Sequence, residues 1–202
     1  RRVPEERIEE FHLFAQDFNS LLGEMEDWQQ QLQAKNAQLL RTSLHDPLTG
    51  LANRAAFRNV ISTLMKDEAA RRSSALLFLD GDNFKLINDN WGHATGDKVL
   101  IEVASRLMNF VSKRHQAWRL GGDEFAILLR DVHSEAEVKT LCTSLSSQFL
   151  EPFNLHNGHT ATLSLSIGYA LAREHASAEN LQEFADQHMY RMKHRRIPQV
   201  QK

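Results

Sequence analysis

Residues 119–129 read "RLGGDEFAILL", and this stretch decides how the rest of the chain is interpreted. Two glycines and two adjacent acids stand here between apolar runs that have the composition of strands. The runs and the glycine pair predict a β-hairpin. Asp123 and Glu124 are then either its solvated tip or ligands for something charged, with the glycines letting the backbone approach a ligand. The remainder of the chain has to decide between these interpretations.

The composition is that of an ordinary globular protein, long enough for one sizeable domain and an appendage. Of 202 residues, 42% are apolar and 25% are charged. The formal net charge of −2 gives no general attraction to nucleic acid or to anionic membranes. Cys142 is the single cysteine, so no internal disulfide can form and a reducing compartment is expected.

The amino-terminal end indicates a fragment of a longer protein. The chain opens "RRVPEERIEE" without a methionine, and no apolar run reaches the ~20 residues that cross a bilayer. We expect an upstream part, with room for a membrane segment, outside this sequence.

Residues 1–44 carry an apolar stripe that predicts an amphipathic coiled-coil helix. Its positions recur at alternating spacings of three and four, and all except the lysine are apolar: Phe11, Phe14, Phe18, Leu21, Met25, Trp28, Leu32, Lys35 and Leu39. A lone helix with this stripe exposes large aromatic side chains, so a partner helix is expected. The alternative is that the stripe packs against the chain's own globular domain. Coiled-coil dimerisation is the favoured interpretation.

Residues 45–202 predict one α/β domain, separated from the first helix by Asp46-Pro47 and Gly50. The expected elements are a helix over 53–70, a strand over 73–80, a helix over 97–111, hairpin strands over 117–120 and 124–129, a helix from the capping box at 134–137, a long strand after the Asn157-Gly158 turn, and a helix over 178–194. This order predicts an α+β sandwich of the ferredoxin-like, palm type, with a mostly antiparallel central sheet flanked by helices.

Residues 78–97, "FLDGDNFKLINDNWGHATGD", supply further acids. Asp80 falls where the predicted strand ends, and Gly81 and Asp82 follow it. A carboxylate in this position suits a hard cation such as Mg²⁺, although Asp-Gly-Asp alone is more often a turn. If the hairpin lies beside this strand, Asp123 becomes a second carboxylate at the same sheet edge. Two such carboxylates make a site for a nucleoside triphosphate with its metal.

Together these motifs and "DPLTGLANR" (46–54) resemble the GGDEF family of diguanylate cyclases, in type and order, from Asp46 to Arg196. The first helix resembles the end of a HAMP signalling module. The resemblance implies a cytoplasmic domain of a protein anchored in the inner membrane, with an upstream periplasmic sensor region and a regulatory protein as a further partner. It also implies that two GTP molecules are joined into cyclic di-GMP across a homodimer, with Mg²⁺ as the metal and Mn²⁺ as an alternative.

The resemblance also assigns roles at the reacting phosphates. Asp80 and Asp123 ligate the metal with help from the Gly81 carbonyl, and Asp123 or Glu124 assists deprotonation of the attacking 3′-hydroxyl. Lys85, five residues after Asp80, reaches the phosphates as a point charge. These residue types suit phosphoryl transfer, which needs positioning and neutralised charge more than covalent chemistry.

By the same resemblance, Asn88 and Asp97 read guanine, and His93 lines their pocket. Asp97 can accept from the N1–H and N2–H₂ groups of guanine, whereas adenine lacks that edge and leaves the carboxylate unpaired. Taken alone, His93 reads as a structural loop histidine. Gly121 and Gly122 remove the Cβ atoms that would hold a nucleotide away from the turn.

The C-terminal helix departs from the family pattern, in which an arginine follows a lysine by four residues. Lys193 matches the lysine, but Ile197 stands at the arginine position. Arg196, or Arg195, is expected to take over the second phosphate contact. The alternative is a basic last turn favoured by the helix dipole.

A second departure concerns product inhibition. Many family members carry Arg-x-x-Asp before the hairpin, where this chain has Ser112 and His115. Neither can make the bidentate arginine contact that such an inhibitory site needs, and Lys113 and Arg114 are out of register. The sequence therefore predicts no tight product inhibition at this position.

Two other functions remain open at this point. A catalytically silent GGDEF-like module would bind GTP without turnover, although such relatives usually lose the acids present here. A nucleotidyl cyclase making cyclic GMP or cyclic AMP shares the two-carboxylate logic, and the mass of the product separates it from a diguanylate cyclase.

Overall fold

The computed structural model describes residues 5–111, 114–155 and 159–196, with side chains described for 16, 18–33, 35, 43–111, 114–155 and 159–194. The chain divides into two compact units, Arg1–Ser43 and Leu44–Lys202, and each is described by itself. Among the described helices, none combines the length and apolar character that crossing a membrane requires.

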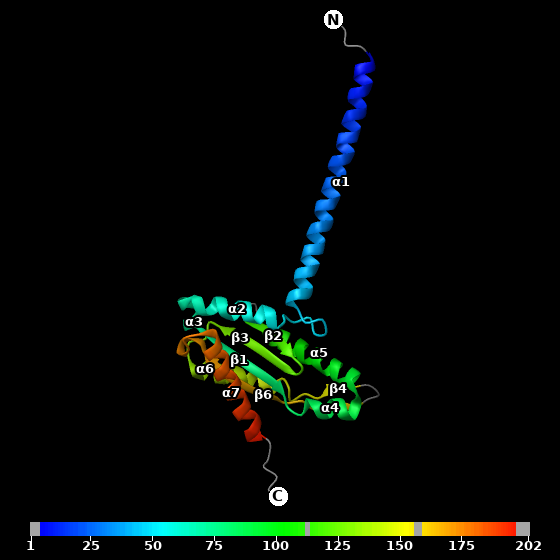
Figure 1. Ribbon diagram of the computed structural model, residues 1–202. Helices are drawn as coiled ribbons and strands as arrows, with labels where there is room; N and C mark the ends of the chain where they lie inside the picture. Colours follow the sequence, from blue (N-terminus) through cyan, green and yellow to red (C-terminus); the bar gives the residue numbers. More distant parts are fainter. Residues whose placement is uncertain (1–4, 112–113, 156–158, 197–202) are drawn as a thin grey trace. The chain divides into compact units, whose positions relative to one another are not determined.

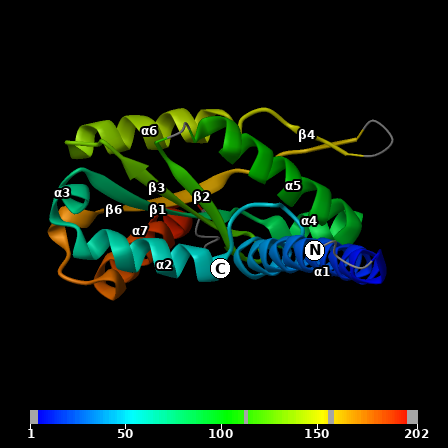
Figure 2. The ribbon, with the colours of Figure 1, turned by 90° about the horizontal axis from the view of Figure 1, so that it is seen from above.

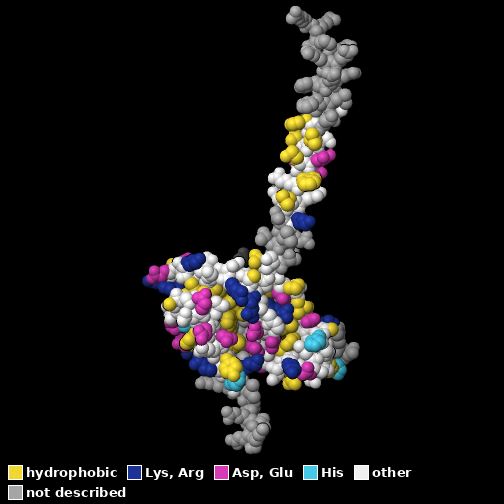
Figure 3. Space-filling view, viewed as in Figure 1, with side chains coloured by type: hydrophobic (Ala, Val, Ile, Leu, Met, Phe, Trp, Pro, Cys, Tyr) yellow, Lys and Arg dark blue, Asp and Glu magenta, His cyan; other side chains and the backbone are white. Residues whose placement is uncertain are grey.

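The first unit is helical, as predicted. Helix α1 runs over Glu5–Leu44, and the apolar side chains described on it are exposed: Phe18, Leu21, Leu22, Met25, Trp28 and Leu32. They form the yellow surface along the described part of the helix in Figure 3. Phe11, Phe14 and Leu39 of the predicted stripe lie outside the described side chains. A long helix with large exposed apolar groups is typical of one strand of a coiled coil.

The second unit is built on a four-stranded sheet in the order β2-β3-β1-β6. Its strands are β1 (Ser74–Gly81), β2 (Gln116–Gly121), β3 (Glu124–Arg130) and β6 (Leu165–Leu171). All three pairings are antiparallel, which confirms the predicted α+β fold. A separate two-stranded sheet pairs β4 (Phe153–Asn154) with β5 (Thr160–Ala161).

Helices cover both faces of the sheet (Figures 1 and 2). The helices are α2 (Arg54–Lys66), α3 (Glu68–Arg72), α4 (Phe84–Trp91), α5 (His93–Phe110), α6 (Glu135–Ser147) and α7 (Ala178–Arg196), with a 3-10 turn over Ala172–Glu174. Side chains alternate along a strand, so Leu77 and Leu79 of β1 join the core under α5 and α6. Leu76 joins the second core, under α2 and α7.

Helix α7 lies directly on strand β6 at Gly168. A Cβ atom there would stand 2.1 Å from the backbone nitrogen of Met189 and 2.3 Å from the carbonyl oxygen of Ala185. Because the obstacles are backbone atoms, a side chain at position 168 would push the helix away from the sheet. This contact brings Lys193, one turn beyond Met189, to the end of the sheet.

Two expected elements are different in the structure. The helix expected over 53–70 is two helices, because the Asp67 carboxylate accepts the backbone N–H groups of Ala69 and Ala70 and caps α3. This break was not predicted, because the helical spacing of the apolar residues in this segment does not reveal it. The long strand expected after residue 158 is divided into β5 and β6, and the Asn157-Gly158 turn lies outside the described residues.

Candidate active site

The ends of β1 and the β2–β3 hairpin bring the predicted metal residues together. Asp80 lies opposite Glu124 of β3 and opposite Ser166 of β6 in the two ladders. The backbone N–H of Gly81 donates to the carbonyl oxygen of Asp123 at 3.3 Å. A Cβ atom on Gly81 would lie 3.5 Å from Oδ2 of Asp123, so the carboxylate of Asp123 stands beside the end of β1.

The electrostatics of this cluster favour a cation. Burial, followed by the charge of Asp80, raises the pKa of Asp123 above its ordinary value. The Lys193 ammonium donates a hydrogen bond to Oδ1 of Asp80. Burial lowers the pKa of Lys193, but that hydrogen bond and the nearby carboxylates outweigh it, so the pKa is raised. Burial is the larger cause of the raised pKa of Asp123, and the neighbouring Asp80 charge adds to it.

These residues fit a hard divalent cation such as Mg²⁺. Asp80, Asp123 and the Gly81 carbonyl are oxygen ligands, which is the preference of that ion. No group of three or more His, Cys, Asp or Glu side chains among the described residues is arranged to hold a metal. Asp80 and Asp123 would give such an ion two carboxylates, and Mg²⁺ sites of this kind complete their coordination with water and substrate phosphates.

Asp82, the second acid of Asp-Gly-Asp, braces the loop after β1. Its two carboxylate oxygens accept hydrogen bonds from the hydroxyls of Ser164, at 2.6 Å, and Ser166, at 2.5 Å. Its backbone N–H donates to the carbonyl oxygen of Ser164 at 2.9 Å. The sequence analysis missed both serines, although their i, i+2 spacing places them on one side of an extended segment.

The hairpin turn is one residue later than the glycine pair suggests. Strand β2 includes Gly121 and β3 begins at Glu124, so the turn residues are Gly122 and Asp123. Gly122 has φ +54 and Gly121 has φ +149, conformations that favour glycine. A Cβ atom at either position would meet nothing within 4 Å among the described residues, so the space beside the turn is open.

Arg119 ties this turn to the segment that leads into the domain. Its guanidinium donates to the Gly122 carbonyl at 3.0 and 2.8 Å and to Oδ1 of Asp46 at 2.9 Å. Burial raises the pKa of Asp46, but hydrogen bonds from Thr49 and Arg119 outweigh it and the pKa is lowered. Sequence reasoning did not find Arg119, because its partner lies 73 positions away.

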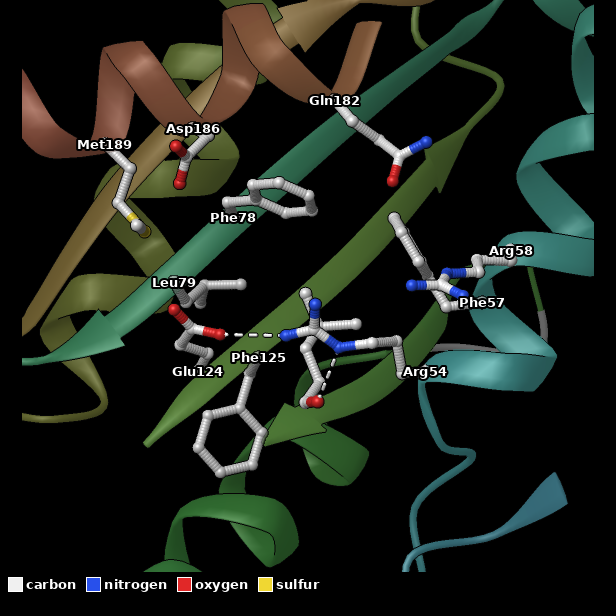
Figure 4. Close-up of a pocket in the computed structure, with 11 residues that line it drawn as sticks. Arg54, Phe57, Arg58, Phe78, Leu79, Glu124, Phe125, Gln182, Asp186 and Met189 are labelled. Carbon is white, nitrogen blue, oxygen red and sulfur yellow. Dashed lines mark hydrogen bonds and ion pairs between the residues drawn. The ribbon is translucent and has the colours of Figure 1, made fainter. Parts of the chain in front are cut away.

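Glu124 is engaged with α2. Its carboxylate accepts from Nη2 of Arg54 at 3.1 Å, and Nε of Arg54 donates to the Leu120 carbonyl at 2.8 Å. Figure 4 shows both contacts at the wall of a pocket of about 270 Å³ between α2 and α7. Of the two acids after the glycines, Glu124 is therefore paired with Arg54, and Asp123 is the one beside Gly81.

The predicted guanine residues lie on two consecutive helices. Lys85 and Asn88 belong to α4, a helix that was not predicted from the sequence, while His93 and Asp97 belong to α5. Lys85, His93 and Asp97 are exposed and Asn88 is half-buried. Helix α4 was missed because it has only eight residues and its N-cap, Asn83, makes no side-chain cap hydrogen bond.

The remaining predicted positions lie partly outside the described residues. The structure does not describe Ser112, Lys113, Ile197 or the side chains of Arg195 and Arg196. His115 is described, and its Nδ1 accepts the backbone N–H of Arg130 at 3.2 Å. Burial lowers the pKa of His115. Its ring is thus engaged with the backbone of β3.

Comparison with known proteins gives a consistent answer. The sequence model of the family "Diguanylate cyclase, GGDEF domain" matches residues 43–197. Diguanylate cyclase DgcN of Escherichia coli K12 is 69% identical over 200 residues, covering 99% of this chain and 49% of that protein. Diguanylate cyclase TpbB of Pseudomonas aeruginosa UCBPP-PA14 is 42% identical over 192 residues, covering 94% and 44%. The chain spans about half the length of these curated relatives.

Solved structures with the same fold are of the same family. The GGDEF domain of TpbB (YfiN) from P. aeruginosa superimposes with a TM-score of 0.70 at 40% identity, covering 75% of this chain and 89% of that one. The coiled coil and GGDEF domain of DgcB from Caulobacter crescentus, in complex with c-di-GMP, gives 0.82 at 27% identity, covering 89% and 95%. The strand-end carboxylates, the hairpin and these matches lead to one conclusion: the chain belongs to the GGDEF family of diguanylate cyclases.

Proposed function

We propose that this chain is the catalytic part of a diguanylate cyclase that joins two GTP molecules into cyclic di-GMP and releases pyrophosphate. The observation that carries the proposal is the meeting of Asp80, Gly81 and Asp123 at one end of the sheet, within reach of Lys193. The 69% identity with DgcN and the match to the family over residues 43–197 support it.

In each half-reaction the 3′-oxygen of one GTP forms a bond to the α-phosphorus of the other, and the bond to pyrophosphate breaks. Asp80, Asp123 and the Gly81 carbonyl are the proposed ligands of Mg²⁺, with Mn²⁺ as the alternative. When bound, this ion neutralises phosphate charge. Lys85 and Lys193 bind phosphate oxygens. Asp123, or Glu124 beside it, assists removal of the 3′-hydroxyl proton.

The base is read at the other end of the site. Asn88 and Asp97 bind the guanine edge, and His93 lines the pocket. The exposure of Asp97, beside the half-buried Asn88, supports a surface subsite that substrate completes.

Each protomer holds one GTP, so two copies must face each other. We propose that residues 1–44 are the end of a HAMP-type signalling helix whose exposed apolar stripe pairs with a second copy. A change in the conformation of this helix would reach the hairpin through Asp46 and Arg119, because Arg119 donates hydrogen bonds to both Asp46 and the Gly122 carbonyl. In the full-length protein, an inner-membrane anchor with a periplasmic sensor region and a regulatory partner would act through this connection, with the present chain on the cytoplasmic side.

The proposal includes the absence of tight product inhibition at residues 112–115. The bond between His115 and the backbone of Arg130 supports it, because it engages one of the two positions with the protein itself.

The test is incubation of the chain with GTP and Mg²⁺ and identification of the products by mass. Cyclic di-GMP formed by the wild type and lost in Asp123→Ala is the expected result. GTP binding without any product would favour the silent module, and a cyclic mononucleotide would favour the other class of cyclase.

A further inference from the structure

Gly96 lies near the start of α5, in a place where the helix itself does not require glycine. Its φ is not among the positive values that distinguish Gly92, Gly121 and Gly122. Alanine is the better residue inside a helix, because glycine loses more backbone entropy on folding. Gly96 is buried, and its backbone N–H donates to the Gly92 carbonyl at 3.2 Å. The reason for glycine must therefore lie in what surrounds it.

The space that a Cβ atom would take at position 96 is filled by Asn88. The ideal Cβ would lie 1.9 Å from Oδ1 and 3.0 Å from Cγ of Asn88, and 3.1 Å from Cζ of Phe84. These obstacles are the far ends of side chains on α4. At Gly168 the obstacles are instead backbone atoms at 2.1 to 2.5 Å. An alanine at position 96 can be accommodated by moving the Asn88 carboxamide and shifting the Phe84 ring by a few tenths of an ångström, whereas an alanine at position 168 requires moving a helix.

We propose that Gly96 is a specificity-determining positioning residue, which keeps the carboxamide of Asn88 against α5 beside Asp97. The inference rests on the proposed function, in which Asn88 and Asp97 read one guanine base. A carboxylate that accepts from the donors of guanine discriminates well only if its neighbouring polar group is held in register with it. Asn88 is on α4 and Asp97 on α5, so the close approach at Gly96 sets that register.

The direct test is Gly96→Ala, measured by binding rather than turnover. The probes are the α,β-methylene analogues of GTP and ATP, which cannot release pyrophosphate. We expect the affinity for the guanine analogue to fall about tenfold, as when one hydrogen bond to the ligand is lost. The weaker affinity for the adenine analogue should not change, so the ratio between the two falls by the same factor. The melting temperature should stay within about 2 °C of the wild type, because alanine favours the helix.

A double-mutant cycle separates this role from a general packing effect. Asn88→Ala should weaken binding of the guanine analogue, and adding Gly96→Ala to it should cause no further loss, since the two act through one group. Gly23→Ala is the matched control, because it is also a helical glycine and a Cβ there meets nothing within 4 Å. It should leave binding unchanged.

Three results would overturn the inference: wild-type affinity in Gly96→Ala, a further loss when Gly96→Ala is added to Asn88→Ala, or a large fall in the melting temperature. The last would mean that the fold, and not Asn88, requires the glycine. Failure of the wild type to prefer the guanine analogue would be a different outcome, because it would refute the assignment of Asn88 and Asp97 under the proposed function.

Discussion

The two ends of the candidate site are built in different ways. At the proposed metal end, three aspartates stand where strands meet, and hydrogen bonds hold two of them: two serine hydroxyls hold Asp82, and Lys193 holds Asp80. At the base end, Lys85, His93 and Asp97 project from two helices and are exposed. Asn88 is half-buried there and packs closely against Gly96.

This difference suggests a division of labour. A preorganised arrangement of charges acts mainly on the transition state and so on kcat. Exposed groups that substrate must complete contribute mainly to binding and so to KM.

The largest effect is expected at the strand ends. Asp80→Ala should lower kcat at least about 100-fold, the range found when a preorganised electrostatic contact is removed. KM for GTP should change much less. Initial rates of pyrophosphate release at several GTP concentrations measure both quantities. A variant that kept wild-type kcat with a raised KM would place Asp80 in ground-state binding, and it would contradict the proposed difference between the two ends of the site.

The hydroxyls of Ser164 and Ser166, which hold Asp82, should matter nearly as much for metal binding as Asp82 itself. Asp82→Ala should weaken Mn²⁺ binding, followed by electron paramagnetic resonance, by about tenfold or more, as when an outer-shell partner of a metal ligand is lost. The double variant Ser164→Ala with Ser166→Ala should do the same. A serine variant that bound Mn²⁺ like the wild type would show that these two hydrogen bonds do not support the metal site.

At the base end a smaller and different change is expected. Asp97→Asn loses an acceptor for the guanine donors, so KM for GTP should rise about tenfold while kcat stays near its original value. Inosine triphosphate, which lacks the 2-amino group, should lose less affinity. An equal loss for both nucleotides would show that Asp97 does not read that amino group.

The contrast between the strand ends and the two helices also explains which parts of the molecule could be predicted from the sequence. The sheet was predictable because short apolar runs, turn glycines and acids at strand ends are local signals, and the antiparallel sheet confirms it. Helix α4 was not, because eight residues between an unusual N-cap and Gly92 carry too little periodicity.

The partners of the site residues were equally hidden. Ser166 reaches Asp82 across 84 positions, and Arg119 reaches Asp46 across 73. No pattern within one segment reports such pairs, because the strand register that creates them is a tertiary property. Gly96 was visible in the sequence, but the reason for a glycine there depends on the side chain of Asn88, which fills the space of a Cβ atom.

The smallest expected effect concerns stability. Burial and the charge of Asp80 raise the pKa of Asp123 above 3.8, so its ionised form is disfavoured in the folded state. Below pH 3.8 the carboxyl is protonated whether the chain is folded or unfolded, and it costs nothing. As the pH rises from there through the raised pKa, the folded state loses stability, and above that pKa the loss is complete.

Without metal at neutral pH, Asp123→Asn should therefore melt slightly above the wild type, and the difference should vanish as the pH approaches 3.8. The difference should be small because Asp123 is only half-buried and solvent screens its charge. Added Mg²⁺ should reverse the order, since only the wild type gains binding free energy. Thermal melts at several pH values, with chelator or with Mg²⁺, measure this. A wild type that melted higher in chelator at neutral pH would mean that Lys193 and Arg119 already balance Asp123, and the metal end would then not be poised for a cation.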